Sequence, residues 1–293
     1  MGIHMPELPE IETVKLQLEK VLAGAKIEGV EVRMKKTVQG DEKQAIGKKI
    51  LGVRRRAKAL IMDLEDGISM AFHFKMSGQL ILDRDEKGET FADRIVGGHP
   101  TADFVGKLPS GHTRVIFDLD NGKLFFNDQR MFGWVKIGKR EEIEKEKFFA
   151  NLGPEPFDMT AREFKRQLGS SRRAIKLSIM DQTVISGVGN IYANDALWEA
   201  NILPDRPTNS LTDAEAEKLF EAIKTVLNEG IKYGGATAAD AKYINLHGLG
   251  GHYQEHFRTY DREGKNCLRK DGGIIERETL GGRGTFYCPR CQK

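Results

Sequence analysis

Near the middle of the chain lies the stretch Leu152-Gly153-Pro154-Glu155-Pro156. Proline restricts its own backbone and that of the residue before it, so two prolines and a glycine within five residues interrupt any regular helix or strand. The sequence has short strand-like segments before this stretch and helical periodicity after it. We therefore predict a linker at residues 151–157 between two domains of an α+β protein.

The N-terminal side of the linker predicts a β-sandwich flanked by helices. Apolar residues recur at helical spacing over residues 9–22 and stop at Gly24, which predicts one amphipathic helix. The short apolar segments that follow include the hairpin-turn signals Asp66-Gly67 and Asn121-Gly122. Between residues 83 and 112 we predict a long loop. The strand candidates are residues 49–53, 59–64, 68–74, 79–83, 113–119 and 123–126.

The C-terminal side predicts helices until about Gly234. Thr212-Asp213-Ala214-Glu215 has the pattern of a capping box, and the apolar residues after it share one helical face and are followed by Gly230. The chain has only three cysteines, all near its C-terminus: Cys267, Cys288 and Cys291. Few and clustered cysteines argue against a disulfide scaffold and for a terminal metal-binding module or its remnant.

The composition is that of a soluble globular protein, with 39% hydrophobic and 30% charged residues. No apolar run approaches the roughly 20 residues that span a bilayer, and no signal peptide is recognisable, so we expect a cytoplasmic protein without a membrane partner. The net charge of +3 permits a polyanionic partner without requiring one. Basic clusters at residues 54–58 and 160–176 suit either DNA binding or ordinary solvated surface.

The most specific local motif is Pro6-Glu7-Leu8-Pro9-Glu10, directly after Met5. If residues 1–4 are a cloning scar or an upstream mis-start, removal of Met5 leaves Pro6 with a free secondary amine. Such an amine titrates near about pH 8 and can attack a sugar C1′ to form a Schiff base. The two carboxylates of the motif could transfer protons. The same residues would also suit an ordinary helix start, with proline in the first turn and acids at its positive end.

This N-terminus resembles that of bacterial formamidopyrimidine-DNA glycosylases, and the resemblance continues along nearly the whole chain. Each further stretch is weak alone, but their order and spacing together identify the chain as similar to this family. In order they are Arg55-Arg56-Ala57-Lys58, His73-Phe74-Lys75-Met76-Ser77-Gly78, Asp128-Gln129-Arg130-Met131-Phe132-Gly133, the linker 152–156, Gly187-Val188-Gly189-Asn190-Ile191-Tyr192-Ala193 and Thr285-Phe286-Tyr287-Cys288-Pro289-Arg290-Cys291-Gln292-Lys293.

The resemblance implies a base-excision repair enzyme, a bifunctional DNA glycosylase and abasic-site lyase. Its expected partner is double-stranded DNA that contains oxidised purines, such as 8-oxoguanine and formamidopyrimidines, or abasic sites. It implies a catalytic β-sandwich domain, a helix–two-turn–helix DNA-binding domain and a zinc-finger-like β-hairpin, which we expect at residues 5–150, 158–251 and 255–293. A monomer associated with the nucleoid is expected.

By position, the resemblance also implies residue roles. The implied catalytic residues are Pro6 as nucleophile, Glu7 as the acid that assists sugar-ring opening, Lys58 as lesion contact and proton donor, and Arg283 as phosphate contact. The implied DNA-binding residues are His73, His112, Arg172 and Asn190, together with Met76, Arg130 and Phe132, which would fill the space left by the extruded base. Without the resemblance, a methionine and a phenylalanine in strand-rich segments would be interpreted as core residues.

Two other functions stay open at this point. An endonuclease VIII-like enzyme for oxidised pyrimidines usually has glycine at the position of Leu8 and differs at the three residues that would enter DNA. A catalytically silent lesion-binding protein is the second alternative. If the residues before Met5 are native, the Pro6 nitrogen is an amide without an available lone pair.

The C-terminal module departs from the four-cysteine zinc finger of the family. The pair Cys288-Pro289-Arg290-Cys291 is intact, but the other reads Cys267-Leu268-Arg269-Lys270, with lysine at the fourth ligand position. A protonated lysine cannot bind zinc. Three thiolates could still hold zinc, with Asp271 or a water as fourth ligand, or the hairpin could fold without metal.

Overall fold

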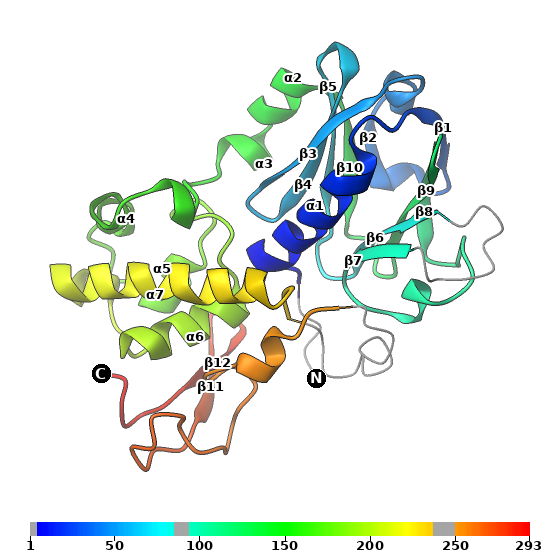
Figure 1. The fold of residues 1–293 in the computed structure, drawn as a ribbon. Coiled ribbons are helices and arrows are strands. Elements are labelled where there is room, and N and C mark those ends of the chain that lie inside the picture. The colour runs from blue at the N-terminus through cyan, green and yellow to red at the C-terminus, as the bar shows by residue number, and fades with distance from the viewer. Residues whose placement is uncertain (1–4, 85–93, 237–249) are drawn as a thin grey trace. The chain divides into compact units, whose positions relative to one another are not determined.

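The computed structural model describes residues 5–84, 94–236 and 250–293, so the origin of residues 1–4 lies outside it. By its contacts the chain divides into two units (Figure 1). One consists of Met1–Ala150 and Tyr233–Gln254, and the other of Asn151–Lys232 and Glu255–Lys293. No helix in the described part of the chain combines the length and apolar character that a membrane crossing requires.

The first unit contains two five-stranded sheets. One has the order β1-β8-β9-β6-β7, with β1 (Ile27–Val32), β6 (Gly78–Asp83), β7 (Arg94–Gly98), β8 (Thr113–Leu119) and β9 (Gly122–Asp128). The other has the order β2-β10-β5-β4-β3, with β2 (Val38–Gly40), β3 (Ile50–Arg56), β4 (Ala59–Leu64), β5 (Ile68–His73) and β10 (Trp134–Lys139). Both predicted hairpins are present, and the predicted α+β class with its β-sandwich is confirmed.

The shorter elements of this unit connect the strands. They are the 3-10 helices η1 (Lys35–Thr37), η2 (Glu42–Ala45), η3 (Glu65–Gly67) and η4 (Ala102–Phe104), and the helices α2 (Arg140–Lys145) and α3 (Lys147–Ala150). A further 3-10 helix, η7 (Tyr253–His256), lies where the chain passes from the first unit to the second.

The helix α1 (Leu8–Leu22) completes the core of the first unit. It contacts β3 and β7, which are the edge strands of the two sheets (Figure 1). Because edge strands carry unpaired backbone groups, a helix that packs against both protects the open side of the sandwich. Its buried residues join phenylalanines of both sheets in one core: Ile11, Val14, Leu18, Leu22, Phe72, Phe117 and Phe126.

The expected long loop between residues 83 and 112 is partly wrong, because β7 and η4 lie within it. Two consecutive glycines gave β7 a weak strand signal, yet one of them is required by packing. A Cβ atom on Gly97 would lie 2.0 Å from Cγ2 of Val14 on α1. At the start of β7, Arg94 Nε donates to Asp83 Oδ2 at 2.8 Å in a buried ion pair.

The second unit is helical and ends in a hairpin. It contains α4 (Ala161–Leu168), α5 (Ile175–Ile179), α6 (Asn190–Ala200) and α7 (Asp213–Lys232), the 3-10 helices η5 (Pro156–Asp158) and η6 (Thr208–Ser210), and the strands β11 (Glu276–Leu280) and β12 (Arg283–Tyr287). The capping box is present, since Glu215 accepts from Thr212 N at 2.8 Å. Gly230 lies inside α7 and does not end it, because a Cβ there would lie 2.5 Å from the buried Tyr192 ring.

Candidate functional site

The N-terminal motif forms the start of α1. Pro6 is buried, and Glu7 is the N-cap residue with 4% of its surface exposed. The Glu7 N–H donates to Glu10 Oε2 at 2.8 Å, and Glu10 Oε1 accepts from Ala236 N at 2.8 Å. The helix-start role of these acids is therefore realised, and Glu10 also ties the segment at residues 233–236 to the same helix end.

Lys58 lies in the tight turn between β3 and β4 and is 5% exposed. Arg55 connects this turn to α1. Its Nε lies 2.8 Å from Glu12 Oε2 on the helix, and its Nη1 donates to the carbonyl of Ala57 at 3.1 Å. Since the Arg55 side chain is only 9% exposed, water competes little for these bonds. Arg55 therefore ties the Lys58 turn to α1, the helix that begins two residues after Pro6.

His73 ends β5 and pairs in register with Ala59, the residue after Lys58. Burial lowers the pKa of His73 to about 3, and the charges of Lys75 and Lys58 act in the same direction. The Lys75 N–H donates to His73 Nδ1 at 3.0 Å, so the ring is neutral and carries its proton on Nε2. Towards a phosphate, His73 can offer a neutral hydrogen bond and no positive charge.

Met76, Arg130 and Phe132 lie together on two loops, residues 74–77 between β5 and β6 and residues 129–133 between β9 and β10. Arg130 Nη1 is 3.2 Å from Met76 Sδ, and Arg130 Cζ is 5.4 Å from the centre of the Phe132 ring. Phe132 is 58% exposed, so it is not a core residue.

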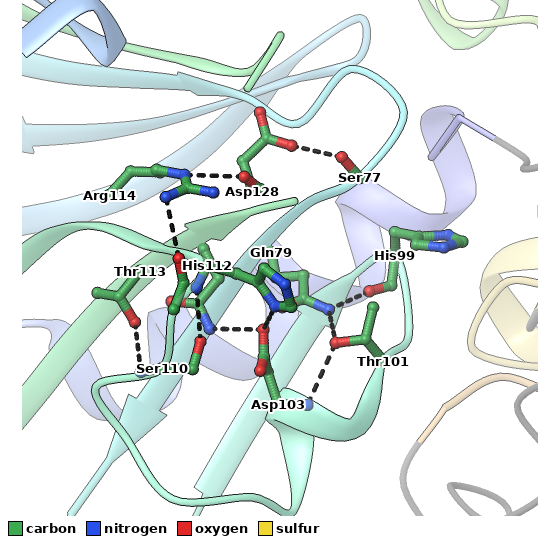
Figure 2. Close-up of polar contacts among 12 residues, drawn as sticks. Ser77, Gln79, His99, Thr101, Asp103, Ser110, His112, Thr113, Arg114 and Asp128 are labelled. Carbon is green, nitrogen blue, oxygen red and sulfur yellow. Dashed lines mark hydrogen bonds and ion pairs between the residues drawn. The ribbon is translucent and has the colours of Figure 1, made fainter. Parts of the chain in front are cut away.

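His112 lies just before β8 and is held by a buried carboxylate (Figure 2). Its Nδ1 is 3.0 Å from Asp103 Oδ2, and the Asp103 carboxylate also accepts from Asn127 Nδ2 at 3.3 Å. The His112 side chain itself is 40% exposed. The ring is therefore fixed at one nitrogen and open to a partner at the other.

In the second unit, Asn190 and Arg283 come together although they are far apart in sequence. Asn190 is the first residue of α6, and its Nδ2 donates at 3.1 Å to the carbonyl of Gly284, the residue after Arg283. Arg283 is exposed at the start of β12. A helix N-terminus beside an arginine favours an anion. Arg172 is exposed in the segment before α5.

Lys176 has a role that the sequence pattern concealed. The sequence places Lys176 in the basic cluster at residues 160–176, but the structure buries its side chain fully on α5. Its Nζ donates to the Gly284 carbonyl at 2.9 Å and to Thr285 Oγ1 at 2.7 Å. A lysine buried in this way fixes the hairpin strand next to Arg283. Lys176 differs from exposed basic residues of the same cluster, such as Arg172, only through its contacts with the distant residues Gly284 and Thr285.

The three cysteines gather around Asp271. The ligand atoms of Cys267, Asp271, Cys288 and Cys291 all lie within 4.8 Å of one another, with Cys267 Sγ 3.9 Å from Cys291 Sγ and Cys288 Sγ 3.7 Å from Asp271 Oδ2. Thiolates about 2.3 Å from a tetrahedral ion are roughly 3.8 Å apart, so the set fits a four-coordinate metal.

Lys270 is exposed with a left-handed φ of 55°, and this conformation brings the next residue, Asp271, to the cluster. Gly273 N donates to Asp271 Oδ1 at 2.8 Å, while Oδ2 lies on the side of the sulfurs. Of the three possibilities left open by the sequence, this geometry favours Asp271 as the fourth ligand.

We expect the buried neutral His73 to make the protein sensitive to acid. Its folded pKa of about 3 lies below the ordinary value of 6.5, so the unfolded chain takes up the proton first and stability is lost as the pH falls between these values. When the pH is lowered from about 7 to about 4.5, the free energy of unfolding should therefore fall less for His73→Gln than for the wild type. Urea titrations at the two pH values measure this difference. An equal loss in the two proteins would show that His73 is protonated in the fold.

Three family models match consecutive parts of the chain. The model described as "Formamidopyrimidine-DNA glycosylase N-terminal domain" matches residues 5–135, and the one described as "Formamidopyrimidine-DNA glycosylase H2TH domain" matches residues 152–242. The "Zinc finger found in FPG and IleRS" matches residues 272–293, which include Cys288 and Cys291.

Known proteins resemble the chain over its whole length. A formamidopyrimidine-DNA glycosylase of Pelotomaculum thermopropionicum is 40% identical over 99% of both chains, and one of Desulfitobacterium hafniense is 35% identical over 98% of this chain and 100% of its own. The crystal structure of the MutM (Fpg) protein from Thermus thermophilus aligns with a TM-score of 0.83, 35% identity and 98% coverage of both chains. The crystal structure of Lactococcus lactis Fpg with abasic-site DNA aligns with a TM-score of 0.82 and 31% identity, and the alignment covers 98% of this chain and 100% of that one. The chain therefore belongs to the formamidopyrimidine-DNA glycosylase family of base-excision repair enzymes.

Proposed function

We propose that the protein is a bifunctional glycosylase and abasic-site lyase for oxidised purines in double-stranded DNA. The observation that carries the proposal is the position of Pro6, buried at the start of α1, with Glu7 next to it and the Lys58 turn tied to the same helix through Arg55. Lactococcus lactis Fpg has been crystallised with DNA that contains an abasic site and with DNA that contains Fapy-dG. These two ligands represent the product and the substrate class proposed for this chain.

In the proposed mechanism, Pro6 is the N-terminal residue and its amine attacks C1′ of the damaged nucleotide. The N–C1′ bond forms as the glycosidic bond breaks, the base leaves with the bonding electron pair, and the proton lost by the amine is taken up by the departing base. Glu7 donates a proton to O4′ as the sugar ring opens, which leaves an iminium ion. Loss of a C2′ proton then drives β-elimination of the 3′ phosphate, and a second elimination releases the 5′ phosphate. Lys58, held at the adjacent turn, is the proposed proton donor of strand cleavage.

The proposed DNA contacts come from both units. In the first unit, His73 and His112 would donate to backbone phosphates, and Met76, Arg130 and Phe132 would enter the stack when the damaged base is extruded. In the second unit, Asn190 and Arg283 would bind one stretch of backbone, with Arg172 as a further contact. Phosphate contacts position the enzyme on the duplex, and the inserted side chains act where base pairing is broken.

The C-terminal module is proposed to hold zinc through Cys267, Asp271, Cys288 and Cys291. Three soft thiolates and one carboxylate favour Zn²⁺ over hard cations. The ion would act structurally, because four protein ligands leave no position for a substrate or water. It would fix the loops at the base of the β11–β12 hairpin, which carries Arg283.

A direct test of the mechanism compares three forms of the protein on 8-oxoguanine duplex DNA with borohydride. The form that begins at Pro6 should be trapped covalently, because reduction converts the iminium ion to a stable amine. Pro6→Gly should be trapped much less, and a form that retains residues 1–5 should not be trapped, because its Pro6 nitrogen is an amide. Equal trapping of all three forms would show that another amine, such as that of a lysine, is the nucleophile.

Asn190 and Arg283 provide a matched pair for the phosphate contacts. Arg283→Ala should weaken binding to lesion-containing and abasic duplexes alike and reduce the slope of log affinity against log salt by about 0.9, because one phosphate charge is no longer neutralised. Asn190→Ala should weaken binding without changing this slope, since amide hydrogen bonds release no counterions. Fluorescence anisotropy over a salt series measures both quantities. An unchanged slope for Arg283→Ala would contradict the assigned contact.

The metal ligands can be tested with neighbouring residues. Asp271→Ala should lose zinc to a chelator at least about tenfold faster than the wild type, because the fourth ligand is gone, whereas Lys270→Ala should behave like the wild type. Cobalt substitution gives a second readout, since tetrahedral thiolate coordination has a characteristic visible absorption that Asp271→Ala should alter. If Lys270→Ala is the variant that loses metal, Asp271 is not the ligand.

A further inference from the structure

The two loops that carry Met76, Arg130 and Phe132 are joined by a single buried carboxylate. Asp128 is the last residue of β9 and is 1% exposed. One oxygen, Oδ1, accepts from Ser77 Oγ at 2.5 Å and from Arg130 N at 3.2 Å, and the other, Oδ2, accepts from Gly133 N at 2.6 Å. Figure 2 shows the Ser77 contact.

Each of these donors belongs to Met76, Arg130 or Phe132 or to the residue that follows one of them. Ser77 follows Met76, Gly133 follows Phe132, and the third donor is the backbone of Arg130 itself. Ser77 Oγ also accepts from Arg130 N at 2.9 Å, which closes the connection between the loops. In register, Gly78 and Asp128 are partners in the β6–β9 ladder, so the carboxylate lies where both loops leave the sheet.

The loops hold conformations that their own residues disfavour. Lys75 and Met131 have φ values of 50° and 58°, in the left-handed region where a side chain adds strain. Gly133 is closely packed, because a Cβ there would lie 2.9 Å from Phe126 Cζ, 3.0 Å from Asp128 Oδ2 and 3.1 Å from the carbonyl of His73. Bonds from outside the loops are therefore needed to stabilise this arrangement.

A carboxylate suits this position because it only accepts hydrogen bonds and offers two oxygens. A buried charge is stabilised only by several donors, and here backbone and hydroxyl groups supply them. The same bonds therefore stabilise the charge and order the loops.

We infer that Asp128 is a positioning residue that fixes Met76, Arg130 and Phe132 in one arrangement before DNA binds. This inference rests on the proposed function, in which these side chains enter the stack as the damaged base leaves. Because the loops are ordered in the free protein, the binding energy available to extrude the base is not reduced by the cost of ordering them.

The test compares a substrate that requires base extrusion with one that does not. Asp128→Asn keeps the size of the side chain but turns an NH₂ group towards at least one donor. With 8-oxoguanine duplex DNA, single-turnover excision should fall at least about tenfold. With a single-stranded abasic oligonucleotide, which has no base to extrude, cleavage should stay within about twofold of the wild type. The fluorescence increase of 2-aminopurine placed beside the lesion, which reports unstacking, should also become slower.

Two further variants separate positioning from stability. Asp83→Asn breaks a buried ion pair with Arg94 in the same sheet, and it should change both activities together through the folded fraction. Ser77→Ala removes one donor and should give a smaller loss that is confined to the duplex. Equal losses on both substrates for Asp128→Asn, or an unchanged duplex rate, would overturn the inference. Failure of the wild type to excise 8-oxoguanine from the duplex would refute the proposed function, and the inference with it.

Discussion

The burial of the apolar face of α1 between the two edge strands is the constraint on which the rest of the first unit depends. Chain termini usually fray unless other interactions hold them. Here Ile11, Val14, Leu18 and Leu22 are each at most 4% exposed, and burial of one such side chain contributes about 1.5–3 kcal/mol. The ion pair of Glu12 with Arg55 and the bonds of Glu10 then fix the helix orientation. The start of this helix, which carries the proposed nucleophile Pro6, is therefore anchored to the core of the first unit.

A second principle recurs in both units, since several side chains near the proposed DNA contacts are oriented by hydrogen bonds to the backbone. Asn190 bonds to the Gly284 carbonyl, His73 accepts from the Lys75 N–H, and Asp128 accepts from the N–H of Gly133. His73 and Asp128 are the last residues of β5 and β9, so their bonds to the loop N–H groups transfer the rigidity of the strands to the loops.

Much of the fold follows from local patterns, and what does not follow depends on contacts between distant segments. The sandwich, both hairpins and the capping box of α7 were predicted because each signal lies within a few neighbouring residues. The strand β7 was missed because Gly97, a poor strand former, is there to make room for Val14. Lys176 and Asp128 stand in recognised clusters and motifs, but their partners come from other parts of the chain. The position of Asp271 depends on the left-handed turn at Lys270, which no spacing rule reveals.

The carboxylate in the C-terminal cluster has a chemical consequence of its own. Peroxide converts cysteine thiolates to sulfenic acid and then irreversibly to sulfinic and sulfonic acids, whereas an aspartate is inert to this chemistry. With Asp271 beside Cys267, Cys288 and Cys291, the cluster contains one oxidisable side chain fewer than a four-cysteine finger. Under the proposed function, the oxidants that damage purines also attack such thiolates, and the carboxylate of Asp271 removes one of the four points of attack.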